Sequence, residues 1–352
     1  MTEKSHLPAD HPRIAPARVG VLLINLGTPE ATSYWPMRRY LKEFLSDRRV
    51  IEANRALWWV ILNGIILTTR PKRSGHAYDK IWNRERDESP LKTITRSQAA
   101  GLAQALDGKL MGEPGWQEAP LLVDWAMRYG LPPIAERLAA LKQAGCERIL
   151  LFPLYPQYSA TTTASVLDKA YEALQAMRWQ PAIRTVPPYY DDPAHIAALS
   201  HSLETALKAL PWQPDRILMS FHGLPKDYWD KGDPYHCHCL KTARLVREKM
   251  GLGADRLQVV FQSRFGKAEW LQPYAQDTVE ALPGQGVKNL LMITPGFAAD
   301  CVETLEEVAI GLGEIFHERG GENFATVPCL NDTSESIHML ETIIRRELMG
   351  WR

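Results

Sequence analysis

Residues 288–303 read Lys-Asn-Leu-Leu-Met-Ile-Thr-Pro-Gly-Phe-Ala-Ala-Asp-Cys-Val-Glu. This stretch predicts the strand, turn and helix start from which the fold is built. An apolar run stops at a Pro-Gly turn and is followed by a helical pattern over 301–317, which indicates a buried strand and then a helix. Residues 148–159, Arg-Ile-Leu-Leu-Phe-Pro-Leu-Tyr-Pro-Gln-Tyr-Ser, follow the same plan. When Pro156 is aligned with Pro295, Tyr158 lies opposite Phe297. This repeat predicts two halves that fold alike.

Short apolar runs alternate with amphipathic segments along the rest of the chain. The predicted strands are 19–26, 120–125, 148–154, 182–187, 215–221, 257–262, 288–294 and 324–329, and the main predicted helices are 131–144, 162–177, 193–209, 237–250 and 301–317. This alternation is typical of α/β proteins, whose parallel sheets are covered by helices on both faces. Eight strands can form one sheet, a barrel or two four-stranded sheets, and the repeat favours two sheets.

We therefore expect two doubly wound domains that face each other across a cleft. The first domain is predicted over residues 18–187, together with a last helix over 334–352 that packs back on it. The second is predicted over residues 188–333.

Composition and motifs narrow the class of protein. The 352 residues include 41 basic and 41 acidic side chains, and neither the net charge nor any motif favours a nucleic-acid partner. The P-loop, the G-x-G-x-x-G fingerprint and the G-x-S-x-G elbow are missing, so we expect an activity that needs no nucleotide. Five cysteines show no disulfide-framework spacing, and residues 1–17 lack the apolar core of a signal peptide. These features favour a cytoplasmic protein.

His222 stands where a predicted strand ends. Residues 215–225 read Asp-Arg-Ile-Leu-Met-Ser-Phe-His-Gly-Leu-Pro. Ligands of α/β proteins bind at the carboxyl ends of strands, and a histidine there can exchange a proton near neutral pH or ligate a metal. A histidine that only closes the turn fits the pattern equally well.

A row of carboxylates opens the predicted helix at 301–317. At 100° per residue, Asp300, Glu303 and Glu307 fall within about 60° of one another on one face. Such a row can simply complement the helix dipole on a solvated face. It can also relay protons or hold a hard divalent cation. Because His222 lies at the same edge of the predicted sheet, the combination suits Fe(II) binding or the removal of protons from a ligand.

The segment 56–73 is unusually apolar for a surface. Residues 56–67 read Ala-Leu-Trp-Trp-Val-Ile-Leu-Asn-Gly-Ile-Ile-Leu, and three basic residues follow at 70, 72 and 73. The run is shorter than the ~20 residues that span a bilayer. It suits a buried core helix, an interfacial segment with tryptophans at the headgroup level, or the apolar lip of a pocket for a flat ligand.

Three other patterns are weaker. Arg128-Tyr129 at a strand end could bind an anionic substituent, and Trp270 could line a pocket for a planar ligand, although core packing explains each as well. His236-Cys237-His238-Cys239 is spaced too tightly for four ligands to reach one ion. This motif therefore favours the start of a helix over a structural metal site.

Taken together, these motifs resemble the ferrochelatase family. The similar segments run in family order from about residue 18 to 330: Asn25-Leu26-Gly27-Thr28-Pro29, Arg128-Tyr129, Tyr155-Pro156-Gln157-Tyr158-Ser159, Ser220-Phe221-His222-Gly223-Leu224-Pro225, Gly232-Asp233-Pro234-Tyr235, Gln262-Ser263 with Trp270-Leu271, and Phe297-Ala298-Ala299-Asp300-Cys301-Val302-Glu303-Thr304-Leu305.

The resemblance implies two Rossmann-like domains, each with a four-stranded parallel sheet, around a porphyrin cleft. It implies insertion of Fe(II) into protoporphyrin IX, giving protohaem and two protons. The family's histidine and essential glutamate fall on His222 and Glu303, which are also the candidate metal contacts. Its acidic row falls on Asp300, Glu303 and Glu307, on a helix with a π-type distortion. Its pocket-lining positions are Leu26, Arg128, Tyr129, Trp270 and Phe297, and its apolar lip is the segment with Trp58 and Trp59.

The resemblance also sets the expected partners. Porphyrin and ferrous iron are substrates, and no cofactor is tightly bound. Separately, the Trp58-Trp59 segment and the apolar product predict a peripheral contact of 56–73 with the inner face of the plasma membrane. Some members hold a [2Fe–2S] cluster with cysteines near the C-terminus. This chain has no cysteine after Cys329, so no cluster is expected. Cys301 stands where some members have histidine. The alternatives are a coproporphyrin III ferrochelatase, a cobalt or nickel chelatase, a porphyrin or haem carrier, and a binding protein for an anionic small molecule.

Overall fold

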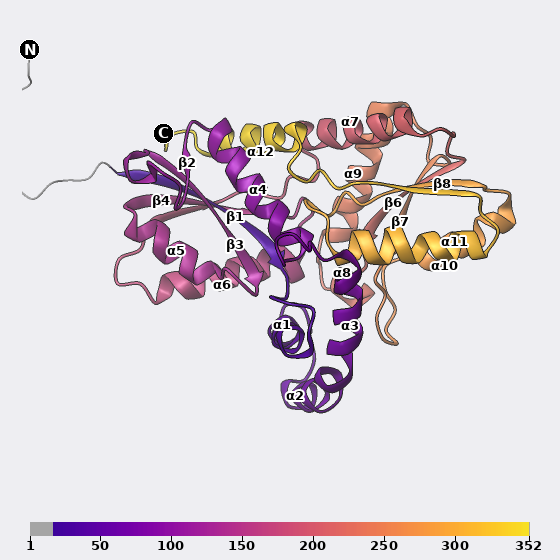
Figure 1. Ribbon diagram of the computed structural model, residues 1–352, viewed down its shortest axis with the longest axis horizontal. Helices are drawn as coiled ribbons and strands as arrows, with labels where there is room; N and C mark the ends of the chain where they lie inside the picture. The colour runs from indigo at the N-terminus through magenta and orange to yellow at the C-terminus, as the bar shows by residue number, and fades with distance from the viewer. Residues whose placement is uncertain (1–16, 352) are drawn as a thin grey trace, which may run out of the picture.

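The computed structural model describes residues 17–351. The stretch 1–17, which is predicted to lack a signal peptide, therefore lies almost wholly outside the described residues. Two parallel sheets lie side by side, each with helices on both faces (Figure 1). The first sheet has the order β2-β3-β1-β4-β5. Its strands are β1 Arg18–Gly27, β2 Lys109–Leu110, β3 Leu121–Tyr129, β4 Cys146–Pro153 and β5 Ala182–Thr185. The second has the order β7-β6-β8-β9. Its strands are β6 Arg216–His222, β7 Leu257–Gln262, β8 Asn289–Ile293 and β9 Asn323–Val327.

The two predicted sheets are confirmed. The first sheet has five strands, however, one more than the four that were expected. The additional strand, β2, is only two residues long and pairs with β3 at the sheet edge. A two-residue strand has no alternation of apolar and polar side chains, so hydrophobic periodicity could not reveal it.

The predicted repeat is confirmed by the topology. Strands β3-β1-β4-β5 follow the same spatial order as β7-β6-β8-β9, and all the pairs are parallel. The repeated sequence stretches lie on β4 and β8, which hold equivalent places. Their carboxyl ends therefore point toward corresponding positions in the two sheets.

The helices of the first half of the chain are α1 Tyr34–Ser46, α2 Arg55–Ile61, η1 Leu62–Ile66, α3 Leu67–Ile81, α4 Pro90–Ala105, η2 Trp116–Glu118, α5 Ile134–Gln143, η3 Ala160–Ala164 and α6 Ser165–Gln175. Those that follow are α7 Pro193–Ala209, α8 Lys226–Asp230, α9 Tyr235–Met250, α10 Ala275–Ala281, η4 Pro283–Gln285, η5 Glu303–Leu312, α11 Gly313–Glu318 and α12 Ser334–Glu347. The last helix, α12, packs against α4 and also against α7.

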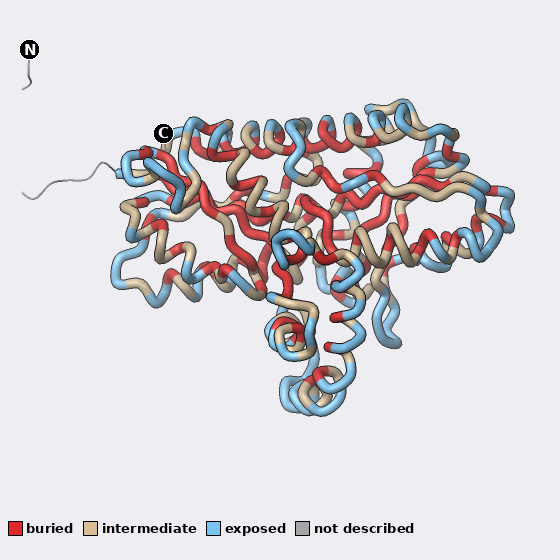
Figure 2. Tube along the Cα trace, in the orientation of Figure 1, coloured by how far each residue is buried: buried red, intermediate tan, exposed pale blue. Residues whose placement is uncertain are grey.

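The main core joins the two sheets. One continuous apolar cluster extends from Val19 on β1 through Ile217 on β6 to Ile344 on α12. The inner strands are buried along nearly their whole length, as Figure 2 shows. This burial explains their unbroken apolar runs, because helices cover both faces of each sheet.

Helices α1, α2 and α3 project away from the sheets, with α2 near the tip (Figure 1). The tip is largely exposed (Figure 2). Among residues 17–351, no helix is long and apolar enough to cross a membrane.

Candidate active site

A cavity of about 340 Å³ opens between the two sheets and is lined by residues of both. It lies at the carboxyl ends of strands: Leu26 is the last residue but one of β1, Leu154 follows β4, His222 ends β6, Ser263 follows β7 and Phe297 follows β8. This is the edge at which α/β proteins bind ligands. The volume lies in the range of small-molecule sites, and the lining is mostly apolar with a few polar groups.

His222 lines this cavity and has a defined tautomer. Its Nδ1 lies 2.6 Å from the carbonyl oxygen of Gly223. A carbonyl oxygen can only accept, so Nδ1 must carry the hydrogen. In the neutral ring, Nε2 is then left with its lone pair and can accept a proton or contact a metal.

Glu307 lines the same cavity and is held by Ser263. Its carboxylate accepts hydrogen bonds from the backbone nitrogen of Ser263 at 2.7 Å and from Ser263 Oγ at 2.6 Å. Burial nevertheless raises the pKa of Glu307, and the negative charge of Glu303 adds to the rise. Both Ser263 bonds and the nearby His222 oppose it. A raised pKa makes this carboxylate a better proton acceptor than an ordinary glutamate.

Glu303 begins η5, which is a π-helix over its ten residues. The π-type distortion expected on this helix is confirmed, so the 100° count does not apply here. The wider turn of a π-helix places residues four to five apart on one side, and both Glu303 and Glu307 line the cavity. The backbone oxygen of Glu303 accepts from Gln262 Nε2 at 2.9 Å, which ties the start of η5 to β7.

Asp300, the third member of the predicted acidic row, does not line the cavity. It is buried, and its oxygens accept hydrogen bonds from Asn331 Nδ2 at 2.6 Å and Thr304 Oγ1 at 2.8 Å. Its own backbone nitrogen donates to Asn331 Oδ1 at 2.8 Å. The predicted one-face row of three carboxylates is therefore incorrect, because Asp300 precedes the helix and turns into the loop that supports it.

Leu26, Trp270 and Phe297 line the cavity, in agreement with the positions that the family resemblance assigned. The indole Nε1 of Trp270 is buried without a hydrogen-bond partner among the described residues. A buried donor without a partner is costly. Gly223 makes room for this ring, because a Cβ there would lie 3.1 Å from Trp270 Cε3 and 2.7 Å from the Gln262 carbonyl oxygen.

Arg128 and Tyr129 do not line the cavity, contrary to the prediction. Both contact Asp47, which follows α1: Arg128 Nη2 forms an ion pair with it, and Tyr129 Oη donates to it at 2.8 Å. Ser165 on α6 contacts the same carboxylate. Burial opposes ionisation of Asp47, but the hydrogen bonds from Ser165, Arg49 and Tyr129 and the Arg128 charge prevail and lower its pKa. The cluster anchors the base of the projecting helices to the first sheet.

No pattern in the sequence pointed to Asp47 or to Phe265. Asp47 lies in a charged stretch without a motif, and Phe265 lies in an exposed loop after β7. Phe265 lines the cavity together with Arg70 of α3, and the Arg70 guanidinium carbon lies 4.9 Å from the centre of its ring. Residues from both halves of the chain therefore form the cavity mouth.

Cys301 lines the cavity and stays protonated at neutral pH, because burial and then the charge of Glu303 raise the pKa of its thiol well above the usual value. The His236–Cys239 motif forms the first turn of α9, as predicted. There His238 stacks on Tyr190 with ring centres 3.6 Å apart. In the described part of the chain, no three or more metal-ligating side chains are placed to hold a metal ion.

Comparisons with known proteins agree with this geometry. The family model described as Ferrochelatase matches residues 18–348. The chain is 57% identical over 351 residues to the ferrochelatase of Agrobacterium fabrum, covering 99% of each chain. It is 58% identical over 342 residues to that of Rhizobium meliloti, with 97% of this chain and 98% of the relative covered. It is 56% identical over 334 residues to that of Brucella ovis, with 95% and 92% covered.

Solved structures support the fold. SirB from Bacillus subtilis with Fe3+ superposes with a TM-score of 0.55 at 11% identity, covering 95% of this chain and 98% of that one. The cobalt complex of the sirohydrochlorin chelatase SirB from Bacillus subtilis subspecies spizizenii gives a TM-score of 0.52 at 9% identity, with 95% and 96% covered. At such identities the likeness shows the fold alone, whereas the family match and the relatives above 55% identity decide the classification. The chain belongs to the ferrochelatase family.

Proposed function

We propose that the protein inserts Fe(II) into protoporphyrin IX, giving protohaem and two protons, as the last step of haem synthesis. The observation that supports this most directly is one cavity in which His222, Glu303 and Glu307 lie among apolar walls from both sheets. An apolar cavity suits the macrocycle, and the three polar groups suit the metal and the protons. Membership of the ferrochelatase family supports the same reaction.

The reaction must remove two pyrrole protons and strip water from Fe(II). His222 Nε2, whose lone pair is free because Nδ1 donates to Gly223, accepts a pyrrole proton or contacts the iron. Glu303 is the second metal contact, and Glu307, with its raised pKa, carries protons away. His222 and Glu303 would hold the iron only transiently, since the metal is cargo and the product must leave.

The apolar walls of the cavity contribute by bending the porphyrin. A flat porphyrin holds its nitrogen lone pairs in the ring plane, and a cavity that binds it bent exposes them to the metal. Binding energy from the apolar contacts would offset the strain of this distortion. Trp270 contributes its indole ring to these walls.

The test is an anaerobic assay of purified protein with Fe(II) and protoporphyrin IX, in which haem is followed by its absorbance. Haem formation above the rate without protein is expected. Coproporphyrin III is assayed in parallel, because a higher kcat/KM with that porphyrin would reassign the substrate. Cobalt and nickel are tested as competing metals. Porphyrin binding without metal insertion would identify a carrier, and failure to quench porphyrin fluorescence would favour an unrelated anionic ligand.

We also propose that the tip of the projecting helices rests on the inner face of the plasma membrane. Leu57, Trp59, Val60 and Ile65 are 59–66% exposed there, beside basic residues of α3. The two tryptophans differ: Trp59 points outward, whereas Trp58 donates through Nε1 to the Leu45 carbonyl oxygen at 2.7 Å and packs inward. An exposed apolar patch with basic neighbours suits an anionic lipid surface.

This membrane contact can be tested by co-sedimentation with anionic liposomes. Trp59→Ser should reduce the bound fraction severalfold, whereas Trp179→Ser, which alters an exposed tryptophan near the end of α6, should not. Equal binding by both variants would contradict the membrane contact and leave the segment only a role as a pocket wall. We propose a cytoplasmic enzyme that works without a [2Fe–2S] cluster, and an iron and sulfide analysis of anaerobically purified protein tests the latter.

A further inference from the structure

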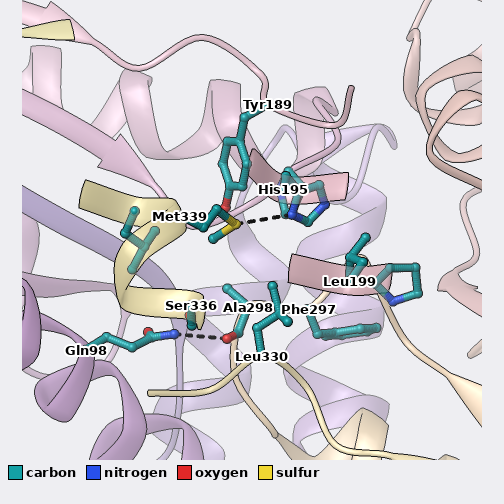
Figure 3. Close-up of a pocket in the computed structure, with 12 residues that line it drawn as sticks. Gln98, Tyr189, His195, Leu199, Phe297, Ala298, Leu330, Ser336 and Met339 are labelled. Atoms are coloured by element: carbon teal, nitrogen blue, oxygen red, sulfur yellow. Dashed lines mark hydrogen bonds between the residues drawn. The ribbon is translucent and has the colours of Figure 1, made fainter. Parts of the chain in front are cut away.

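Gln98 joins α4 to the loop that leads to Glu303. It is fully buried, and its Nε2 donates to the carbonyl oxygens of Ala298 at 2.9 Å and Asn331 at 2.7 Å; Figure 3 shows the bond to Ala298. Two carbonyl oxygens determine which end of the amide carries nitrogen, because the reversed amide would set oxygen against oxygen. Gln98 therefore supplies two donors from α4 to a segment beyond β8 and another beyond β9.

Both acceptors belong to the support of the π-helix. Ala298 lies beside Phe297 in the cavity wall. The side-chain amide of Asn331 bonds to Asp300 at both ends. Its Oδ1 accepts from the Asp300 backbone nitrogen at 2.8 Å, and its Nδ2 donates to the Asp300 carboxylate at 2.6 Å. Asp300 in turn accepts from Thr304 Oγ1 at 2.8 Å, and Thr304 directly follows Glu303. A continuous set of hydrogen bonds thus connects Gln98 with the first turn of η5.

Side chains fill the space behind this wall almost completely. Phe297 and Ala298 line both the large cavity and a second one of only about 10 Å³. Gln98, His195 and Met339 also line this second cavity (Figure 3). Such a volume holds at most one water molecule. Bulk solvent therefore cannot replace the two donors of Gln98 if they are removed.

We propose that Gln98 is a positioning residue for iron insertion. It holds the loop at 297–300 against α4, so that Glu303 is presented to the cavity at the angle the reaction needs. The inference rests on the proposed iron-insertion activity. Gln98 touches neither substrate, and its effect passes through Ala298, Asn331 and Asp300.

The first test is Gln98→Met, which keeps the length of the side chain and removes both donors. We expect kcat to fall about 10- to 100-fold, because small displacements of a reacting group are costly. The dissociation constant for protoporphyrin IX, measured by fluorescence quenching, should stay within about threefold, since apolar contacts dominate that binding. Ser97→Ala is the matched control. It removes a hydrogen bond from the neighbouring α4 residue to Asp332 and should leave kcat unchanged.

The second test is a double-mutant cycle with Asn331→Gly. Asn331 has φ of 50°, a backbone conformation that glycine adopts readily. The substitution therefore removes only the two side-chain hydrogen bonds to Asp300. If Gln98 acts through Asn331, the double variant should be no slower than the slower single variant. Should Gln98→Met fail to fold, Gln98→Asn, which retains the amide but shortens its reach, is expected to show the same loss.

Wild-type kcat in folded Gln98→Met, even with a lower Tm, would overturn the positioning role. Rate losses that simply multiply in the double variant would also overturn it. A wild-type protein that makes no haem would instead refute the proposed function itself, so the two failures can be told apart.

Discussion

The imidazole Nδ1 of His222 donates to the carbonyl oxygen of Gly223 across 2.6 Å. A residue that ends a buried strand is thereby locked by its own neighbour into one tautomer. The pairing leaves Nε2 as the ring atom that can accept a proton, and it does so without a carboxylate partner for Nδ1. We therefore assign the pyrrole proton to Nε2.

Gly223 should be essential for the shape of the cavity. A Cβ at this position would lie 2.7 Å from the Gln262 carbonyl oxygen and 3.1 Å from Trp270 Cε3. Gly223→Ala should therefore displace Trp270 and raise the KM for porphyrin about tenfold or more, on the scale of about 1.4 kcal/mol per factor of ten. Steady-state haem synthesis measures this. Gly284→Ala, where a Cβ meets nothing within 4 Å, is the control, and equal KM values for the two variants would contradict the prediction.

Arg128 should act on stability and not on porphyrin binding. Its ion pair with Asp47 is buried, with side-chain exposures of 11% and 8%. Arg128→Met leaves the Asp47 charge unpaired, and we expect a loss of about 3–5 kcal/mol in the free energy of unfolding. Adding Asp47→Asn should restore most of it, as urea denaturation can show. A KM for porphyrin that stays tenfold above wild type in the double variant would contradict this prediction and indicate that Arg128 binds the porphyrin.

Asp124 on β3 should make the protein less stable as the pH rises from 4 to 6. Burial raises its pKa from 3.8 to about 6, although the Trp125 backbone nitrogen and Arg137 oppose the rise. The folded state then binds a proton that the unfolded state releases, so stability falls through this window. Asp124→Asn should gain up to about 3 kcal/mol at pH 7, at 1.36 kcal/mol per pKa unit, and nothing below pH 4. Urea denaturation at pH 7 and pH 4 tests this. A larger gain at pH 4 would reverse the sign and refute it.

His195 on α7 should have the opposite effect. Burial lowers its pKa from 6.5 to about 4, so its contribution is complete above pH 6.5 and is lost as the pH falls toward 4. The change amounts to about 3 kcal/mol. His195→Leu should flatten the loss of stability between pH 6.5 and pH 4, whereas His201→Leu, an exposed position on the same helix, should not. Parallel curves for His195→Leu and wild type would contradict the assignment.

The sequence predicted what depends on local pattern. Apolar runs located eight of the nine strands, and the repeat between β4 and β8 revealed the shared topology. The same patterns could not show that Arg128 pairs with Asp47, because these residues are 81 positions apart. They also could not show that Asp300 turns away from Glu303 and Glu307, since a 100° period assumes that all three lie on one α-helix, whereas Asp300 precedes η5. The fold thus follows from periodicity, whereas the site depends on contacts across the chain.

Single-turnover Fe(II) insertion under anaerobic conditions, with His222→Ala and Glu303→Gln compared with wild type, tests the central claim most directly. His201→Ala and Glu314→Gln, exposed positions on α7 and α11, are the controls, and circular dichroism confirms folding. Both site variants should still quench porphyrin fluorescence while forming haem at least about 100-fold more slowly, as expected for groups that act in the reaction itself. Near-wild-type rates in both folded variants would contradict the account.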